Sequence, residues 1–222
     1  MREQVISLIE QNKIIAILRG VSPSQAVEVA KAIYQGGINL IEVTFNQNNI
    51  KSFNDTVLAI RKIKNNCPNM CVGAGTVLTK EQVDLAISAG AEYIISPDTD
   101  EEVIKYTVEK GLVSIPGAYT PSEVKKAHNA GADFVKLFPC TDATHLKTLK
   151  LPFSQVKFLA FSGVNIDNAQ EFINAGAVGV GVGSAIINIK HIENNEYEKI
   201  IQLAKALVEK VSCKQLKKNK IF

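Results

Sequence analysis

Short apolar runs recur along the chain, and most follow a helical stretch that ends in a glycine. The unit appears in YQGGINLIEVTF, SAGAEYIISP, EKGLVSIPG, NAGADFVKLFP and NAGAVGVGVGS. A glycine after the last helical turn is a common left-handed cap, and the run after it has the length and β-branched content of a strand. The pattern predicts helices and strands in strict alternation.

Three more runs, KIIAILRG, MCVGAGT and VKFLAFSG, complete a series of eight expected strands. The strands are expected near residues 14–18, 38–43, 70–73, 92–96, 112–115, 133–138, 156–160 and 178–182. Alternating strands and helices imply a parallel sheet. Eight units in 222 residues favour a single-domain (β/α)8 TIM barrel, and a doubly wound open sheet is the structural alternative.

The two ends of the chain lie outside this series. Residues 1–12, MREQVISLIEQN, are expected to form a short amphipathic helix, and residues 213–222 a basic tail that is a solvated terminus.

Lys136 interrupts the apolar run FVKLFP, although a buried ammonium is costly unless it is paired or neutralised. It lies five residues after Gly131, and Glu42 lies five residues after Gly37. Residues at the same offset should point to the same face, and alternate barrel strands share interior layers. We therefore expect Glu42 and Lys136, on the second and sixth strands, to face each other across the barrel interior.

The same count places Ile95 and Gly181 in this layer, on the fourth and eighth strands. The layer would then hold an acid, an amine, an aliphatic side chain and an empty place at Gly181. An empty place would leave room for a ligand.

Two interpretations of Glu42 and Lys136 remain open on the residues alone. In one they form a buried structural ion pair, which contributes little net stability. In the other, burial lowers the pKa of Lys136, which then acts as an amine nucleophile toward a carbonyl while the carboxylate moves protons.

Glycine-rich segments after the last two strands are typical of an anion site. GVNIDN and GVGSAI offer backbone N–H groups where barrels often hold phosphate, with Gly163, Gly183 and Ser184 as the expected donors. In the alternative interpretation, these glycines only form tight turns.

Other strand ends supply candidate pocket residues. Arg19 could bind a carboxylate or phosphate, or be a solvated arginine. Thr76 is a possible hydroxyl donor, and Pro97 and Phe138 are expected to form apolar walls.

Composition excludes several classes of partner. A net charge of +3 without a basic patch in the barrel region argues against nucleic acid binding. No apolar run reaches the roughly 18 residues of a membrane span, so a cytoplasmic protein is expected. The four cysteines and three histidines show neither disulfide nor zinc spacing, although carboxylates alone could hold magnesium.

Over most of its length the chain resembles a known family. The segments IIAILRG, IEVTF, VGAGTVLT, YIISP, IPGAYTPSE, FVKLFP and VGVGSAI occur in the order and spacing of the KDPG/KHG aldolases, from about residue 13 to 210. These are 2-dehydro-3-deoxy-phosphogluconate aldolases and 4-hydroxy-2-oxoglutarate aldolases. The resemblance implies a metal-free, cofactor-free TIM-barrel lyase, usually a homotrimer, that acts on 2-keto acids and releases pyruvate.

The resemblance also implies roles for individual residues. Lys136 matches the Schiff-base lysine and Glu42 the general acid/base. The remaining matches are substrate contacts (Arg19 and Thr76), pocket walls (Pro97 and Phe138) and the phosphate site (Gly163, Gly183 and Ser184).

Two departures from the family pattern concern the substrate. Asn46 stands where many members have an arginine that holds the substrate carboxylate, and phosphogalactonate aldolases resemble this sequence there. The usual PTGG reads AFSG, with Phe161 and Ser162 at its centre. Ser162 would bind phosphate, whereas Phe161 would narrow or reorient the site.

The sequence leaves four candidate functions. The first is cleavage of 2-dehydro-3-deoxy-6-phosphogluconate. The second is the same chemistry on 4-hydroxy-2-oxoglutarate or on the galactonate epimer. The third is a phosphate-binding isomerase or epimerase that uses Glu42 without an imine, and the fourth is a non-catalytic binding barrel.

Overall fold

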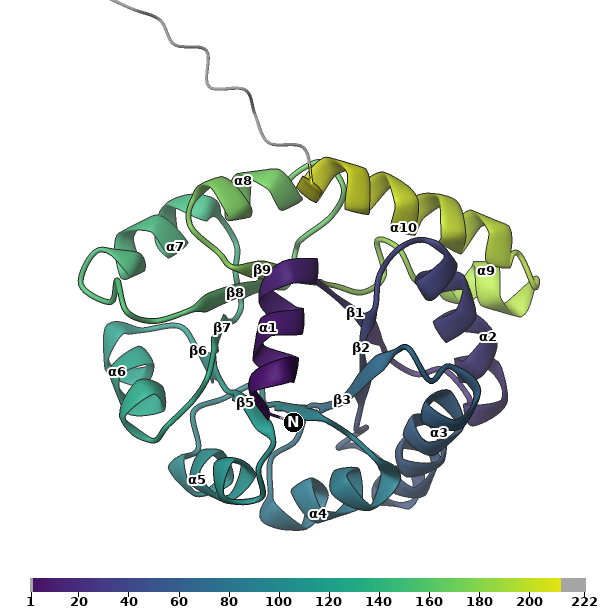
Figure 1. Ribbon diagram of the computed structural model, residues 1–222, viewed down its shortest axis with the longest axis horizontal. Coiled ribbons are helices and arrows are strands. Elements are labelled where there is room, and N and C mark those ends of the chain that lie inside the picture. Colours follow the sequence, from purple (N-terminus) through teal and green to yellow (C-terminus); the bar gives the residue numbers. More distant parts are fainter. Residues whose placement is uncertain (1, 213–222) are drawn as a thin grey trace, which may run out of the picture.

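The computed structural model describes residues 2–212, which form a ring of parallel strands surrounded by helices (Figure 1). The sheet runs in the order β5-β4-β3-β2-β1-β9-β8-β7-β6. Its strands are β1 (Ile14–Leu18), β2 (Leu40–Thr44), β3 (Cys71–Gly75), β4 (Tyr93–Ile95), β5 (Val113–Ile115), β6 (Gly117–Ala118), β7 (Val135–Leu137), β8 (Phe158–Phe161) and β9 (Gly179–Val182).

Nine strand segments stand against eight expected strands, because the two-residue β6 continues the fifth strand, β5, beyond its expected end at residue 115. Pro116, which has no N–H group, separates them. On one side the Ser96 N–H donates to the Ile115 carbonyl (3.1 Å), and on the other the Lys136 N–H donates to the Pro116 carbonyl (2.9 Å). These bonds bring the ends of the sheet together, so the barrel prediction is confirmed and the open-sheet alternative is wrong.

The outer helices follow the strands in the expected alternation. They are α2 (Pro23–Gln35), α3 (Phe53–Asn66), α4 (Lys80–Ala89), α5 (Glu101–Glu109), α6 (Pro121–Asn129), α7 (Ala143–Lys150), α8 (Ala169–Asn174), α9 (Ile189–Glu193) and α10 (Tyr197–Ser212), with a 3-10 turn at Ile50–Ser52. The glycines that follow five of these helices have φ between 79° and 105°, as left-handed caps require: Gly37, Gly90, Gly111, Gly131 and Gly176.

Helix α1 (Arg2–Asn12) confirms the expected N-terminal helix and lies across the centre of the ring (Figure 1). Its buried face, Val5, Ile6 and Ile9, belongs to one cluster with the apolar side chains that fill the barrel interior. Its Arg2 Nη2 pairs with Asp133 at 2.8 Å. Since α1 covers the N-terminal end of the barrel, the open end is the one at which the strands finish.

The predicted basic tail lies outside the described residues. Within residues 2–212, no helix is both long enough and apolar enough to span a membrane.

Candidate active site

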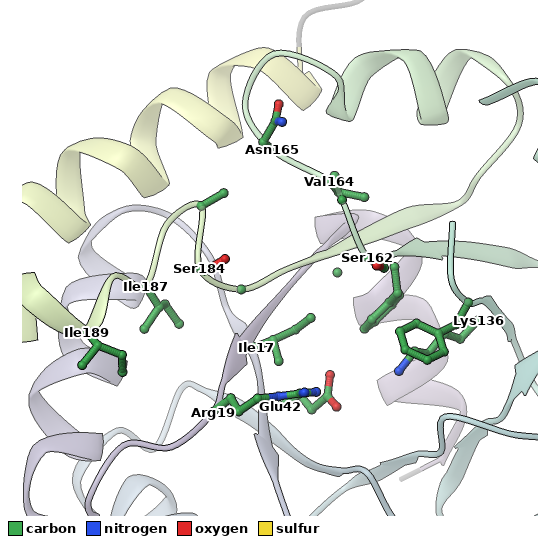
Figure 2. A pocket seen from close by; sticks show the side chains of 16 residues that line it. Ile17, Arg19, Glu42, Lys136, Ser162, Val164, Asn165, Ser184, Ile187 and Ile189 are labelled. Atoms are coloured by element: carbon green, nitrogen blue, oxygen red, sulfur yellow. The ribbon is translucent and has the colours of Figure 1, made fainter. Parts of the chain in front are cut away.

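A cavity of about 800 Å³ lies at the C-terminal ends of β1, β2, β7, β8 and β9 (Figure 2). Its lining consists of Ile17, Arg19, Glu42, Lys136, Phe138, Phe161, Ser162, Gly163, Val164, Asn165, Gly181, Gly183, Ser184, Ala185, Ile187 and Ile189. The cavity therefore brings together most of the residues predicted from the sequence. The charged side chains of Arg19, Glu42 and Lys136 lie at one end, and the loops after β8 and β9 lie at the other (Figure 2).

Three predicted residues do not line this cavity. Asn46 is exposed after β2, where its Oδ1 accepts from the Asn48 N–H (3.1 Å). Thr76 is half-buried with φ +56°, and Pro97 is half-buried after β4. They surround the same strand ends without contributing to the cavity wall.

Lys136 occupies the middle of β7 and points inward. It is 5% exposed, and its Nζ lies 4.5 Å from the ring centroid of Phe138 and 4.9 Å from that of Phe161. Burial lowers the pKa of Lys136; the negative charge of Glu42 opposes this change and the positive charge of Arg19 adds to it. The site therefore favours the neutral amine, which is the nucleophilic form.

Glu42 lies in the middle of β2 and is 1% exposed. Burial raises the pKa of its carboxyl, and the positive charges of Lys136 and Arg19 act in the opposite direction. Its Oε2 has no hydrogen-bond partner among the described residues. A carboxyl with a raised pKa can both take up and release a proton near neutral pH.

The ion pairs within residues 2–212 do not join Glu42 to Lys136. Each charge nevertheless acts on the pKa of the other group, so the two residues interact without a direct contact ion pair. Burial acts on both groups in the direction of their neutral forms.

The expected interior layer is present, except for its empty place. Glu42 is in register with Gly73 and Tyr93, and barrel tilt advances a layer by about one residue per strand. The layer that contains Glu42 therefore passes through Ile95 and Lys136 to Gly181.

The place at Gly181 is not empty. A Cβ atom there would overlap the ring of Phe161, which is 1% exposed. Phe161 therefore fills this position as a wall beside Lys136, and the cavity extends to the ends of β8 and β9.

The loop after β8 lines the cavity with Ser162, Gly163, Val164 and Asn165. Ser162 and Gly163 both have left-handed backbones, with φ of +78° and +69°. The Asn165 Oδ1 accepts from the N–H groups of Asp167 (2.9 Å) and Asn168 (3.2 Å), which fixes the turn. Backbone N–H groups in such a turn can form a concave anion site.

The turn after β9 faces this loop. The Gly183 carbonyl accepts from the N–H groups of Ile186 (3.0 Å) and Ile187 (2.9 Å). The Ser184 and Ala185 N–H groups that begin the turn have no acceptor among the described residues. Together the two loops can hold an anion at the end of the cavity opposite Lys136.

Sequence reasoning missed Gly75, which makes room for Glu42. A Cβ atom at Gly75 would overlap the Glu42 carboxylate. The signal was available, because GAG in VGAGT places Gly73 and Gly75 on one face of β3. The apolar cavity residues Ile17, Ile187 and Ile189 carried no comparable signal.

The described residues contain no group of three or more His, Cys, Asp or Glu side chains that could hold a metal ion. The ionisable side chains that line the cavity are Arg19, Glu42 and Lys136.

Comparison with known proteins identifies the family. Residues 5–203 match the family model described as "KDPG and KHG aldolase". The chain is 34% identical to the KHG/KDPG aldolase of Escherichia coli (strain K12) over 187 residues, which covers 83% of this chain and 85% of that protein. It is also 34% identical over 175 residues to the 2-dehydro-3-deoxy-6-phosphogalactonate aldolase of the same strain, covering 77% and 82% of the two chains.

A solved structure shows the same architecture with a bound reactant. The KDPG aldolase of Legionella pneumophila, with pyruvate captured as a covalent carbinolamine intermediate, superposes with a TM-score of 0.80 and 28% identity. The match covers 91% of this chain and 97% of that one. Since the family match spans nearly the whole barrel, this chain belongs to the KDPG and KHG aldolase family of class I, Schiff-base lyases.

Proposed function

We propose that this aldolase cleaves 2-dehydro-3-deoxy-6-phosphogluconate to pyruvate and glyceraldehyde 3-phosphate, with Lys136 as the imine-forming residue. The observation that carries the proposal is a buried lysine, its pKa lowered by burial, at one end of a cavity whose other end is lined by the loops after β8 and β9. A keto acid with a distal phosphate would fit this arrangement, with its ketone at Lys136 and its phosphate at the two loops.

The reaction begins at the Lys136 Nζ. The neutral amine attacks the C2 ketone, and loss of water from the carbinolamine gives a protonated imine. The C3–C4 bond then breaks, and its electron pair moves toward the imine nitrogen to form an enamine. The C4 hydroxyl proton passes to Glu42 through a water molecule, and glyceraldehyde 3-phosphate leaves.

The second half returns the enzyme to its starting state. Glu42 gives the proton to C3 of the enamine, and hydrolysis of the resulting imine releases pyruvate and the free amine. The Phe138 and Phe161 rings beside the Nζ keep water scarce around the lysine, and Arg19 at the cavity wall is placed to bind the substrate carboxylate.

We assign the phosphate to the two loops after β8 and β9. The N–H groups of Gly163 and Ser184 and the hydroxyl of Ser162 are the donors we expect to contact it. Gly183 allows the backbone to approach, and Phe161, directed toward Lys136, leaves this end open.

Two related substrates are second candidates within the same chemistry. The match to a 2-dehydro-3-deoxy-6-phosphogalactonate aldolase, together with Asn46 in place of an arginine, favours testing the galactonate epimer. The match to a KHG/KDPG aldolase favours testing unphosphorylated 4-hydroxy-2-oxoglutarate. Asn46, Thr76 and Pro97 are proposed to contact substrate only as it fills the mouth of the site.

The test of the imine uses pyruvate and borohydride. Incubation followed by reduction is expected to leave one adduct on Lys136, located by peptide mass spectrometry. Lys136→Met, which keeps length without an amine, should form no adduct. Lys157→Met, which changes a lysine whose side chain is 44% exposed, should react as the wild type does.

A folded wild-type protein that forms no adduct at Lys136 would overturn the aldolase mechanism and leave an imine-free isomerase or a binding barrel. Cleavage rates on the three candidate substrates then identify the preferred one. A rate on 4-hydroxy-2-oxoglutarate equal to that on the phosphorylated acids would contradict the phosphate assignment.

The family resemblance also leads us to propose a homotrimer located in the cytoplasm. Neither assignment is needed for the chemistry above, because the lysine, the carboxyl and the donors all come from one chain.

A further inference from the structure

Two buried oxygen atoms in the barrel interior have no hydrogen-bond partner among residues 2–212. One is Oε2 of Glu42 and the other is Oη of Tyr93. Tyr93 is 0% exposed, and Glu42 is 1% exposed. Buried polar groups are nearly always satisfied by protein or by ordered water, so two unsatisfied groups near one another need an explanation.

The two side chains lie against neighbouring positions of β3. Gly73 is in register with both Glu42 on β2 and Tyr93 on β4. The Tyr93 ring covers Gly73, since a Cβ atom there would overlap it, and the Glu42 carboxylate covers Gly75 in the same way. Positions two residues apart on one strand are about 7 Å apart on the same face, so the two side chains are neighbours in the barrel interior.

The hydroxyl of Tyr93 is a proton donor in this setting. Burial raises the pKa of Tyr93, and the nearby Cys71, Glu42 and Glu92 add to that effect, so the phenol keeps its proton. The cavity reaches Glu42 from above, which gives water a path to the carboxyl.

We propose that buried water links the Tyr93 hydroxyl to Glu42 Oε2, and that Tyr93 thereby positions the Glu42 carboxyl and stabilises its ionised form. Tyr93 is a positioning residue, because it acts through Glu42 and does not line the cavity. This inference rests on the proposed acid/base role of Glu42 for its effect on the reaction, but not for its effect on the carboxyl itself.

The charged and titratable groups around Glu42 define what the test must hold constant. Lys136 on β7 and Arg19 after β1 stabilise the carboxylate, and Tyr93 on β4 is the remaining donor. Tyr93→Phe removes one oxygen and leaves Lys136 and Arg19 in place. Tyr34→Phe, at an exposed tyrosine on α2, is the matched control.

The direct measurement is a ¹³C NMR titration of the Glu42 carboxyl, assigned by its absence in Glu42→Gln. Tyr93→Phe is expected to raise the pKa of Glu42 by half a unit or more, which is about a threefold change in its ionisation equilibrium. Tyr34→Phe should leave it unchanged. In turnover, the acidic limb of the kcat profile should move to higher pH by the same amount.

An unchanged Glu42 titration in a Tyr93→Phe protein that melts cooperatively would overturn the proposal and leave Tyr93 as a packing residue. A high-resolution crystal structure of the wild type checks the link without any variant, and continuous protein packing between the two oxygens would also overturn it. The proposed function fails separately, if borohydride traps no adduct on Lys136. The NMR titration of Glu42 can still be read in that case.

Discussion

Lys136 and Glu42 owe their reactivity to burial, which acts on them in opposite senses. Removal from water disfavours the charged form of each group, so the pKa of the amine falls and that of the carboxyl rises. Arg19 reinforces the first change and opposes the second. The same apolar surroundings therefore favour the neutral, nucleophilic form of Lys136 and allow Glu42 both to accept and to donate a proton.

Burial of Lys136 predicts a pH dependence of stability. The native pKa lies below the unfolded value of 10.5, so between the two values the unfolded chain binds one more proton. The free energy of unfolding therefore increases as pH rises through this window, and this increase is lost as pH falls toward the native pKa. Relative to Lys136→Met, the free energy of unfolding of the wild type should rise by up to about 1.4 kcal/mol per pH unit in the window just below pH 10.5.

Urea unfolding at several pH values measures this difference. The other titrating groups cancel between the two proteins, and Lys157→Met should run parallel to the wild type. If the free energy of unfolding depends on pH in the same way in the wild type and in Lys136→Met, the prediction is wrong. Lys136 would then have the same pKa in the native and unfolded states.

Gly75 predicts a second effect at the residue scale. In Gly75→Ala the new methyl group would overlap the Glu42 carboxylate, so the carboxyl must move. We expect kcat for cleavage to fall by roughly 10²–10⁴, the contribution typical of general acid–base catalysis. Gly111→Ala strains a left-handed helix cap without meeting any atom within 4 Å, so it controls for a general loss of stability. Steady-state kinetics that give the same kcat for both variants would count against this role.

Among the elements, the loops after β2 and β3 are joined by a buried amide network. The Gln47 Nε2 donates to the Thr76 carbonyl (2.5 Å), and the Gln82 Nε2 donates to the Gln47 Oε1 (3.1 Å). The Gln82 Oε1 accepts from the Leu78 N–H (2.6 Å). Gln82, 2% exposed at the start of α4, therefore holds Thr76 in its left-handed conformation.

Gln82→Ala should break this network. The Leu78 N–H and the Gln47 amide would lose their partners, at a cost of about 1–3 kcal/mol in the free energy of unfolding. Gln35→Ala, at an exposed position, should change it by less than about 0.5 kcal/mol. Urea unfolding distinguishes the two, and equal losses would mean that the network does not stabilise the loops.

At the scale of the whole molecule, the two ends of the barrel have different tasks. Helix α1 packs its apolar face on the N-terminal ends of the strands, whereas the C-terminal ends carry the cavity. Stability and chemistry are thereby separated along the barrel axis, as is usual for this fold.

The proposed homotrimer is a prediction for the whole molecule. Light scattering coupled to size exclusion should give three times the mass of one chain over a tenfold range of concentration. A single-chain mass throughout would contradict it. The family resemblance alone supports this expectation.

The sequence by itself determined the alternation of helices and strands, because glycine caps and apolar runs are local signals. It also determined the layer of Glu42 and Lys136, since the offset from each cap fixes which face a side chain takes.

Only the tertiary structure decided how that layer is filled. Phe161 occupies the space at Gly181, Gly75 receives the Glu42 carboxylate, and Tyr93 lies against Gly73. In each of these contacts, a side chain of one strand packs over a glycine of the neighbouring strand, so the contact depends on the direction of that side chain. That direction depends on packing across the barrel, which no local pattern in the chain records.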